Sequence, residues 1–149
     1  MNDYRMLIDG ARVAGEGGHF EVLNPATETA VAQCTAGSLA QLDLAVAAAR
    51  RAFAGWQLTS HAERSACLQR IADAIEQDAE RLARLIVSEQ GKPLALAFSE
   101  VMGGVAWTRY AAAQEIPFEL IEDNATQRVE LHRKPCLLYT SDAADDSLR

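Results

Sequence analysis

The sequence predicts an α/β fold in which short β elements come first, three long helices follow and one more strand comes last. Three patterns support this fold class. Residues 6–37 alternate between apolar and polar side chains and are interrupted by glycine and proline. Residues 38–117 are rich in alanine and carry apolar side chains at helical spacing. Thr126–His132 alternates again and has the composition of a strand.

The β part, residues 6–37, is predicted to be a meander. Gly10 separates two short apolar runs, which is typical of a small hairpin. An extended piece then ends at the turn of Asn24-Pro25, because proline lacks the amide hydrogen that a central strand needs. Thr29–Thr35 completes the meander as a further strand. The expected buried positions of that strand are Val31 and Cys34.

The first helix is expected to begin after Ser38. Its hydroxyl can accept a hydrogen bond from a free amide group of the first turn, and Gln41 can complete a capping box. The following run is dense in alanine and strongly favours a helix, which Gly55 ends. Trp56 and the last apolar residue of the helix are expected to pack it on the next one. The predicted packing face consists of Leu42, Ala45, Val46, Ala49 and Phe53.

The longest helical pattern runs from Ser60 to Gln90 and is expected to form one uninterrupted helix. Ser60 and Glu63 have the spacing of a second capping box. Gly91 suits the left-handed position that follows a helix, and Pro93 suits the first position of the next helix. Apolar side chains recur on one face over the whole run: Leu68, Ile71, Ala72, Ile75, Ala79, Leu82 and Ile86.

The third helix is expected to begin at Pro93 and to end before Pro117. Gly103 and Gly104 lie inside it, where each costs roughly 1 kcal/mol relative to alanine. Such a cost is accepted where another backbone approaches closely, so we expect a close contact there. The predicted packing face consists of Leu94, Ala97, Val101, Val105, Thr108 and Ala112.

Composition and charge exclude several classes of protein. The 149 residues are 49% hydrophobic and 23% charged, as is ordinary for one globular domain. A net charge of −7 argues against nucleic acid as a partner, because that function requires a basic surface. The apolar runs of the sequence are all shorter than the roughly 20 residues that a membrane helix needs. The first residues do not have the pattern of a signal peptide. We therefore expect a cytoplasmic protein with no membrane partner.

Taken by themselves, the polar residues do not assemble an active site. His19, His61 and His132 are far apart in the sequence, and none is spaced usefully from an acid or a cysteine. The sequence lacks a glycine-rich loop that leads into a helix, which a phosphate site would require. Lys92 stands at a helix junction and could meet a phosphate, but we expect a solvated lysine.

The cysteines are also expected to have no chemical role. Cys34, Cys67 and Cys136 have neither the spacing of a metal site nor that of a disulfide framework. Cys34 falls in a predicted strand and Cys67 in a predicted helix, where an activating environment for a nucleophile is not expected. This pattern fits a reducing compartment.

Six short segments carry a further signal. They are Leu7-Ile8-Asp9-Gly10, Val22 to Thr27, Ala45 to Phe53 with Trp56, Glu89 to Pro93, Glu100-Val101, and Arg109-Tyr110-Ala111. In order and spacing across residues 6–135, the chain resembles the amino-terminal third of an aldehyde dehydrogenase. The resemblance is greatest to bacterial NAD(P)-dependent enzymes that act on small or semi-aldehyde substrates.

The resemblance implies the architecture and chemistry of a complete subunit. It implies a Rossmann-type cofactor domain, a catalytic domain and an oligomerisation arm, assembled as a homodimer or homotetramer. A cysteine attacks the aldehyde, hydride passes to NAD or NADP, and a glutamate-activated water hydrolyses the thioester. In the family these groups, like the Rossmann sheet, lie beyond the matched part, so no catalytic or cofactor-binding residue transfers to this sequence.

One site does transfer from the resemblance. Some family members hold a monovalent cation with backbone oxygens before Asn-Pro and with an acid further on. In this sequence the ligands would be Val22 or Leu23 and Glu100, and the site would be incomplete. The alternative for Glu100 is a cap or an ion pair on its helix.

Two hypotheses follow for the chain as a whole. In the first, residues 1–135 are the start of an aldehyde dehydrogenase domain with a meander (6–37), helices (38–117) and an arm strand (123–135), and residues 136–149 are a disordered or artefactual tail. This fragment would be inactive alone and would bind no cofactor. In the second, the chain is a stand-alone helical interaction module whose helices bury their apolar faces on each other.

Overall fold

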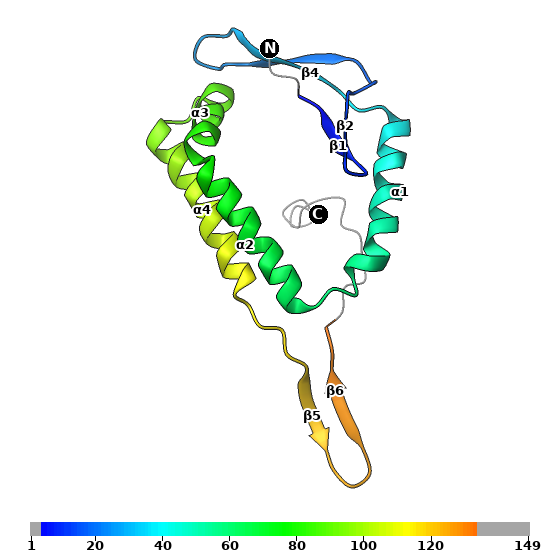
Figure 1. The fold of residues 1–149 in the computed structure, drawn as a ribbon. Helices are drawn as coiled ribbons and strands as arrows, with labels where there is room; N and C mark the ends of the chain where they lie inside the picture. The colour runs from blue at the N-terminus through cyan, green and yellow to red at the C-terminus, as the bar shows by residue number, and fades with distance from the viewer. Residues whose placement is uncertain (1–3, 134–149) are drawn as a thin grey trace, which may run out of the picture.

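A computed structural model describes residues 4–133, and Figure 1 shows their arrangement. The β3–β4 hairpin extends between α1 on one side and the group α2, α3 and α4 on the other, while the β5–β6 hairpin projects away from them. The fold is therefore α/β, as predicted. The elements are β1 (Met6–Ile8), β2 (Ala11–Val13), β3 (His19–Leu23), β4 (Ala30–Thr35), α1 (Leu39–Trp56), α2 (His61–Gln77), α3 (Ala79–Gln90), α4 (Leu94–Ala112), β5 (Glu119–Asp123) and β6 (Arg128–Leu131).

The predicted meander is instead two separate antiparallel hairpins. β1 pairs with β2 around Asp9 (φ 52°) and Gly10 (φ 77°), both in the left-handed region that a two-residue hairpin turn requires. β3 pairs only with β4 within residues 4–133. The segment between the hairpins does not link them into one sheet. Instead the amide of Gly17 donates to the carbonyl of Ala36, and the amide of Ala36 donates to the carbonyl of Gly18. The hairpin around Gly10 was predicted correctly, and the continuous meander was wrong.

The burial of β4 differs in part from the prediction. Cys34 is half-buried, as are Ala32 and Thr35, but Val31 is 41% exposed. Successive side chains of a strand point to opposite faces, so Val31 and Cys34 cannot share one face. The prediction for Val31 was therefore wrong.

The capping box of α1 is present, and its glutamine does more than cap. Gln41 is buried, and its Oε1 accepts hydrogen bonds from the amides of Ser38 and Glu16, each at 3.0 Å. Its Nε2 donates to the carbonyl of Ala14 at 2.8 Å. One side chain thus binds the segment between the hairpins to the start of α1. Hydrogen bonds to both polar atoms of this buried amide offset the cost of removing it from water.

The predicted packing face of α1 is more exposed than expected. The helix packs mainly on β1, and the Asp9–Arg51 ion pair at 3.0 Å adds a second link to that hairpin. Most of the predicted face is half-buried, but Leu42 is 59% exposed. Trp56 is 47% exposed, so the expected packing of α1 on the next helix is weak within the described residues.

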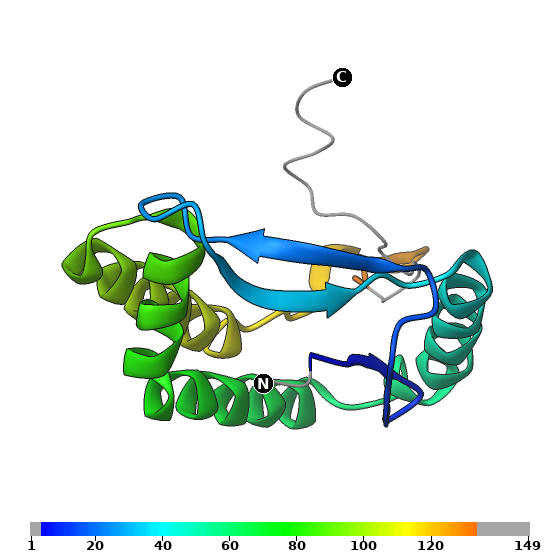
Figure 2. The same cartoon turned by 90° about the horizontal axis from the view of Figure 1, so that it is seen from above.

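The single central helix predicted over Ser60–Gln90 is two helices, which is the main correction to the predicted fold. α2 ends at Gln77 and α3 begins at Ala79, with Asp78 between them at φ −105° and ψ 11°. Aspartate competes with the helix backbone through its short polar side chain, and here the carboxylate accepts from the guanidinium of Arg81. The break turns α3 away from the axis of α2 (Figure 2), so that each packs on α4.

The core lies among α2, α3 and α4 and is built from small residues. Alanine at the contacts lets helix backbones approach closely, and the shared packing fixes their arrangement. The buried residues of α4 are four of the six that its spacing predicted, so the apolar face of this helix was read correctly. The buried positions are Ala72, Ala79, Ala83, Ala97, Val101, Val105 and Ala112, with Ile75, Leu82, Ile86, Val87 and Met102 packed around them.

The glycine pair inside α4 has a different environment from the one predicted. A Cβ atom added at Gly103 or at Gly104 would meet no atom within 4 Å. The expected close backbone contact is therefore absent from the described part of the chain. Pro93 also stands one position earlier than predicted, as the N-cap residue with φ −56°, and α4 begins at Leu94.

The predicted arm strand is one half of a hairpin. β6 occupies Arg128–Leu131 and pairs with β5, which the sequence did not reveal. β5 reads Glu-Leu-Ile-Glu-Asp, and each of its residues is exposed, so it lacks the apolar alternation that marks a strand. The side chain of Asn124 closes the hairpin turn by accepting hydrogen bonds from the amides of Thr126 and Gln127. Residues 136–149, predicted to be a tail, lie outside the described residues.

The cap of α2 makes a pH-dependent contribution. The amide and hydroxyl of Ser60 donate to the Glu63 carboxylate at 2.7 and 2.8 Å, and these bonds hold the pKa of Glu63 below its ordinary value. Because the folded pKa is lowered, the cap stabilises α2 above the ordinary pKa of glutamate and is lost as pH falls through the folded pKa. We expect NMR titration of Glu63 to show a lowered midpoint.

Glu63→Gln provides the control for this pH dependence. Glutamine keeps an oxygen that can accept the bond from the Ser60 amide, but it does not titrate. The variant should keep the cap and lose its change with pH between neutral pH and the acid range. A Glu63 midpoint at or above its ordinary value would contradict the assignment.

Candidate functional site

The junction between α3 and α4 lies against the turn that follows β3. Gly91 adopts φ 70° and donates to the carbonyl of Val87, which is the predicted left-handed end of a helix. A Cβ atom at Gly91 would lie 3.0 Å from Cγ of Pro25, so the turn of the β3–β4 hairpin packs directly on this junction. The sequence placed each of these residues in a turn, but it did not reveal that the two turns touch.

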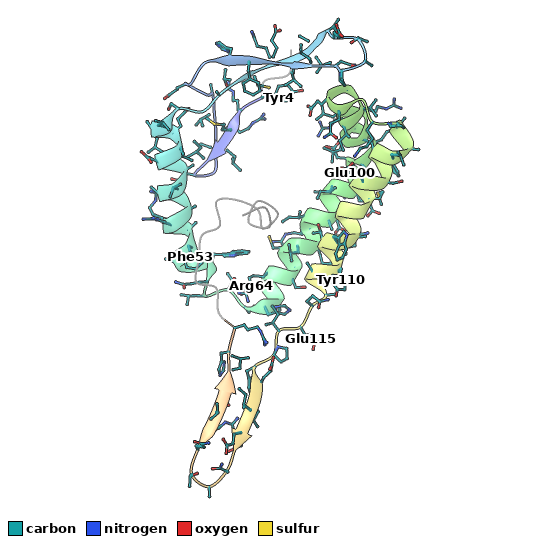
Figure 3. The ribbon with its side chains drawn as sticks, turned by 180° about the vertical axis from the view of Figure 1, so that it is seen from behind. Tyr4, Phe53, Arg64, Glu100, Tyr110 and Glu115 are labelled. Carbon is teal, nitrogen blue, oxygen red and sulfur yellow. The ribbon has the colours of Figure 1, made fainter. Side chains whose placement is uncertain are left out.

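Glu100 is engaged in an ion pair at this junction. Its carboxylate contacts the ammonium of Lys92, eight residues earlier, and Lys92 is half-buried rather than solvated as predicted. Figure 3 shows Glu100 on α4. Val22 lies in β3, which contacts α3, and the pairing register of the hairpin shifts between Val22 and Leu23. The ammonium and a monovalent cation would compete for one carboxylate, and the cation site stays a prediction.

A second charged group links α4 to α2. The guanidinium of Arg109 contacts Glu76 at 2.5 Å and Asp73 at 3.0 Å. Hydrogen bonds to these carboxylates raise the pKa of Arg109, and the bond to Glu76 contributes most. The bridge joins residues more than thirty positions apart in the chain. Sequence reasoning noticed Arg109 only as part of a resemblance, because an ion pair between helices leaves no periodic signal.

The cysteines described by the structure are both free. Cys34 stands opposite Phe20 in the β3–β4 ladder, and Cys67 lies in the interior of α2. Cys136 lies outside the described residues. Over residues 4–133, histidine, cysteine and acidic side chains do not form a group of three or more that could hold a metal ion. In the same range, none of the helices has the length and apolar character needed to cross a membrane.

The described residues do not form a Rossmann-type dinucleotide site. A Rossmann site requires a parallel strand, a glycine-rich turn and a helix whose amino terminus meets the phosphates. In residues 4–133 the sheets are three separate antiparallel pairs. The glycines of residues 15–18 lead into β3 rather than into a helix. The Rossmann sheet of the complete subunit stays a prediction.

Comparison with known proteins identifies the family. The model described as "Aldehyde dehydrogenase family" matches residues 13–136. An N-succinylglutamate 5-semialdehyde dehydrogenase of Chromohalobacter salexigens is 38% identical over 133 residues, which are 88% of this chain and 27% of that relative. A probable aldehyde dehydrogenase of a Pseudomonas species is 36% identical over 132 residues, 89% of this chain and 27% of the relative. The chain belongs to the aldehyde dehydrogenase family.

Solved structures agree in fold. An NAD-dependent benzaldehyde dehydrogenase from Corynebacterium glutamicum superposes with a TM-score of 0.75 at 27% identity, over 82% of this chain and 27% of that one. A betaine aldehyde dehydrogenase from Staphylococcus aureus superposes with a TM-score of 0.76 at 27% identity, over 82% and 25% of the two chains. This chain therefore spans about a quarter of the length of the relatives that it matches.

Proposed function

We propose that this chain is the amino-terminal part of an NAD(P)-dependent aldehyde dehydrogenase and is inactive by itself. The observation that carries the proposal is the 38% identity over 88% of the chain to a relative of which it covers only 27%. The complete enzyme would oxidise a small aldehyde to a carboxylic acid with NAD or NADP. It would be cytoplasmic and would assemble as a homodimer or homotetramer.

The chemistry of aldehyde oxidation supports inactivity of the chain alone. The reaction needs an activated nucleophile, donors for the developing oxyanion and a base for water. Cys34 and Cys67 stand inside a strand and a helix, and neither has a hydrogen-bonded base among the described contacts. What the described residues supply is structural: a helical core, and the ion pairs that Glu100 and Arg109 of α4 make with Lys92, Asp73 and Glu76.

The alternative, a stand-alone helical module, fits the described packing less well. It requires the helices to bury their apolar faces on each other. α2, α3 and α4 do so, but α1 packs mainly on β1 and leaves Leu39 and Leu44 82% and 61% exposed. Large exposed apolar surfaces are uncommon on stable monomers.

The activity of the purified chain tests the proposal. We expect no aldehyde-dependent formation of NADH or NADPH at 340 nm over a panel of small aldehydes and semialdehydes, because the family's catalytic groups are expected beyond the part that this chain matches. The Chromohalobacter salexigens relative, assayed under the same conditions, serves as the positive control. Measurable turnover by the chain alone would refute the proposal of inactivity, and its loss on replacing Cys34 or Cys67 by serine would assign the nucleophile.

A further inference from the structure

The turn of the β1–β2 hairpin contains the only Asp-Gly pair of the sequence. Of all the aspartate and asparagine residues of the chain, only Asp9 is followed by glycine. Glycine has no side chain, so the amide nitrogen that follows Asp9 is less shielded than in front of any other residue. An aspartate carboxyl can therefore reach the next amide nitrogen most readily at this position.

The Asp9-Gly10 turn is open to water. The side chain of Asp9 is 68% exposed. A Cβ atom added at Gly10 would meet nothing within 4 Å, so the space beside this residue is empty of protein atoms. Both residues have the positive φ angles of a two-residue hairpin turn, which place them at the outer end of the hairpin. Packing therefore does not shield the peptide bond between them.

The hairpin that carries this turn is one of the less firmly held parts of the described chain. Each of its strands has three residues, and within residues 4–133 the two strands pair only with each other. A two-stranded hairpin is marginally stable in water unless it packs on another element. Here that element is α1, beside which the hairpin lies in Figure 1. Segments with so few contacts open locally far more often than a core does.

A single ion pair ties the turn itself to α1. Nη2 of Arg51 donates to Oδ2 of Asp9 at 3.0 Å. While this bond is made, the carboxyl of Asp9 is directed at the helix and is not free to move over the Gly10 amide. Both side chains are largely exposed, and exposed ion pairs are weak. The pair can therefore slow a reaction of Asp9, but it cannot prevent one.

We propose that Asp9-Gly10 is a site of spontaneous isoaspartate formation in the folded chain, and that Arg51 slows the reaction. The amide nitrogen of Gly10 bonds to Cγ of Asp9, and the amide proton leaves with the hydroxyl of the carboxyl group as water. The product is a five-membered succinimide ring. Water then cleaves one of the two bonds between the ring nitrogen and a carbonyl carbon. Nothing is oxidised or reduced, and water is the only co-reactant.

The direction of ring opening decides the outcome. Cleavage at Cγ restores aspartate, whereas cleavage at the main-chain carbonyl carbon leaves the chain running through the side chain of Asp9. The second product adds one methylene group to the backbone of a turn that has room for two residues only. The pairing of Ile8 with Ala11 and the ion pair with Arg51 would both be lost. Chemical ageing would thus release the β1–β2 hairpin from α1.

Incubation of the purified 149-residue chain in heavy-oxygen water at neutral pH tests the site. Ring opening introduces one heavy oxygen atom into either product, and fragmentation in a mass spectrometer separates isoaspartate from aspartate. Trypsin releases residues 6–12 as one peptide, because Arg5 and Arg12 frame it. The peptide of residues 71–81 is the internal control, since Asp73 and Asp78 are each followed by alanine. We expect heavy oxygen and isoaspartate to accumulate in residues 6–12 well above the control peptide. Equal labelling of the two peptides would overturn the site.

Arg51→Ala tests the protective role of the ion pair. We expect it to speed labelling of residues 6–12 about twofold to fivefold, the range that loss of an exposed ion pair gives. Arg50→Ala is the matched control, because it removes the same group from the preceding exposed position of α1, whereas the bond to Asp9 comes from Arg51. Both variants should keep the helical circular dichroism, since alanine favours helix. Equal labelling rates in the two variants would overturn the role of Arg51. The activity assay has no bearing on either result, because this inference does not depend on the proposed function.

Discussion

Replacing Val105 with aspartate is expected to unfold the helical part of the chain. Val105 is 1% exposed and is the largest fully buried side chain of the described residues. It is a buried position of α4, which packs on α2, so a carboxylate there would be removed from water. A buried charge that lacks a partner costs about 3–5 kcal/mol, which is a large fraction of the stability of a domain this size.

Circular dichroism at 222 nm and urea unfolding measure this effect. Ala106→Asp is the matched control, because it introduces the same charge one residue later on the exposed side of α4. The control should keep the helical signal, with a loss of no more than about 1 kcal/mol from the lower helix propensity of aspartate. If both variants retained the signal and the urea midpoint of the unchanged chain, the assignment of Val105 to the core would be wrong.

The sequence predicted those features that local chemistry decides. The caps at Ser38 and Ser60 depend on a hydroxyl and a residue three positions later, and both capping boxes are present. Gly91 ends α3 because glycine, which has no Cβ atom, adopts the left-handed conformation without a steric clash. The buried face of α4 was predicted because helical spacing alone decides which side chains lie on one side.

The sequence could not predict features that depend on residues far apart. The apolar pattern of α2 continues through Ala79 into α3, so periodicity does not reveal the break at Asp78. The solvated state expected for Lys92 was wrong because its partner, Glu100, lies on the next helix. β5 was missed because an exposed strand is free of the alternation that burial imposes.

For the candidate site too, local segments were found from the sequence and contacts between distant residues were not. Its residues were found through short segments that resemble a family, and the family is confirmed by the match over residues 13–136. The contact between Pro25 and Gly91 required the fold, since two turns that are 66 positions apart in the chain carry no shared pattern. The glycines of α4 were expected to mark a close backbone contact, and residues 4–133 offer none.

Gly15→Ala is expected to have the second large effect, on the segment that joins the two amino-terminal hairpins. A Cβ atom at Gly15 would overlap the carbonyl oxygen of Ala36 and would lie 2.7 Å from that of Thr35. Both obstacles are backbone atoms, which cannot rotate away as a side chain can. The amide of Gly15 also donates to Oγ1 of Thr35 at 2.9 Å, so the segment cannot withdraw without losing this bond.

The consequence would spread along a short ladder of hydrogen bonds. Gly17 donates to Ala36 at 2.8 Å and Ala36 donates to Gly18 at 2.8 Å, next to the bonds that Gln41 makes. Displacing Gly15 opens these bonds together. We expect a local loss of about 3 kcal/mol, the upper end for overpacking, and hydrogen exchange of the Gly17 and Ala36 amides about a hundredfold faster.

Gly103→Ala is the matched control for Gly15→Ala, because its effect on stability should have the opposite sign. The same methyl group is added, but in the interior of α4 where an added Cβ atom meets nothing within 4 Å. That variant should be stabilised by roughly 0.5–1 kcal/mol, since alanine favours helix over glycine. Opposite signs for one chemical change would show that the surroundings of each glycine, rather than glycine itself, set the cost. Unchanged exchange of the Gly17 amide in Gly15→Ala would instead mean that the segment does not lie against Ala36.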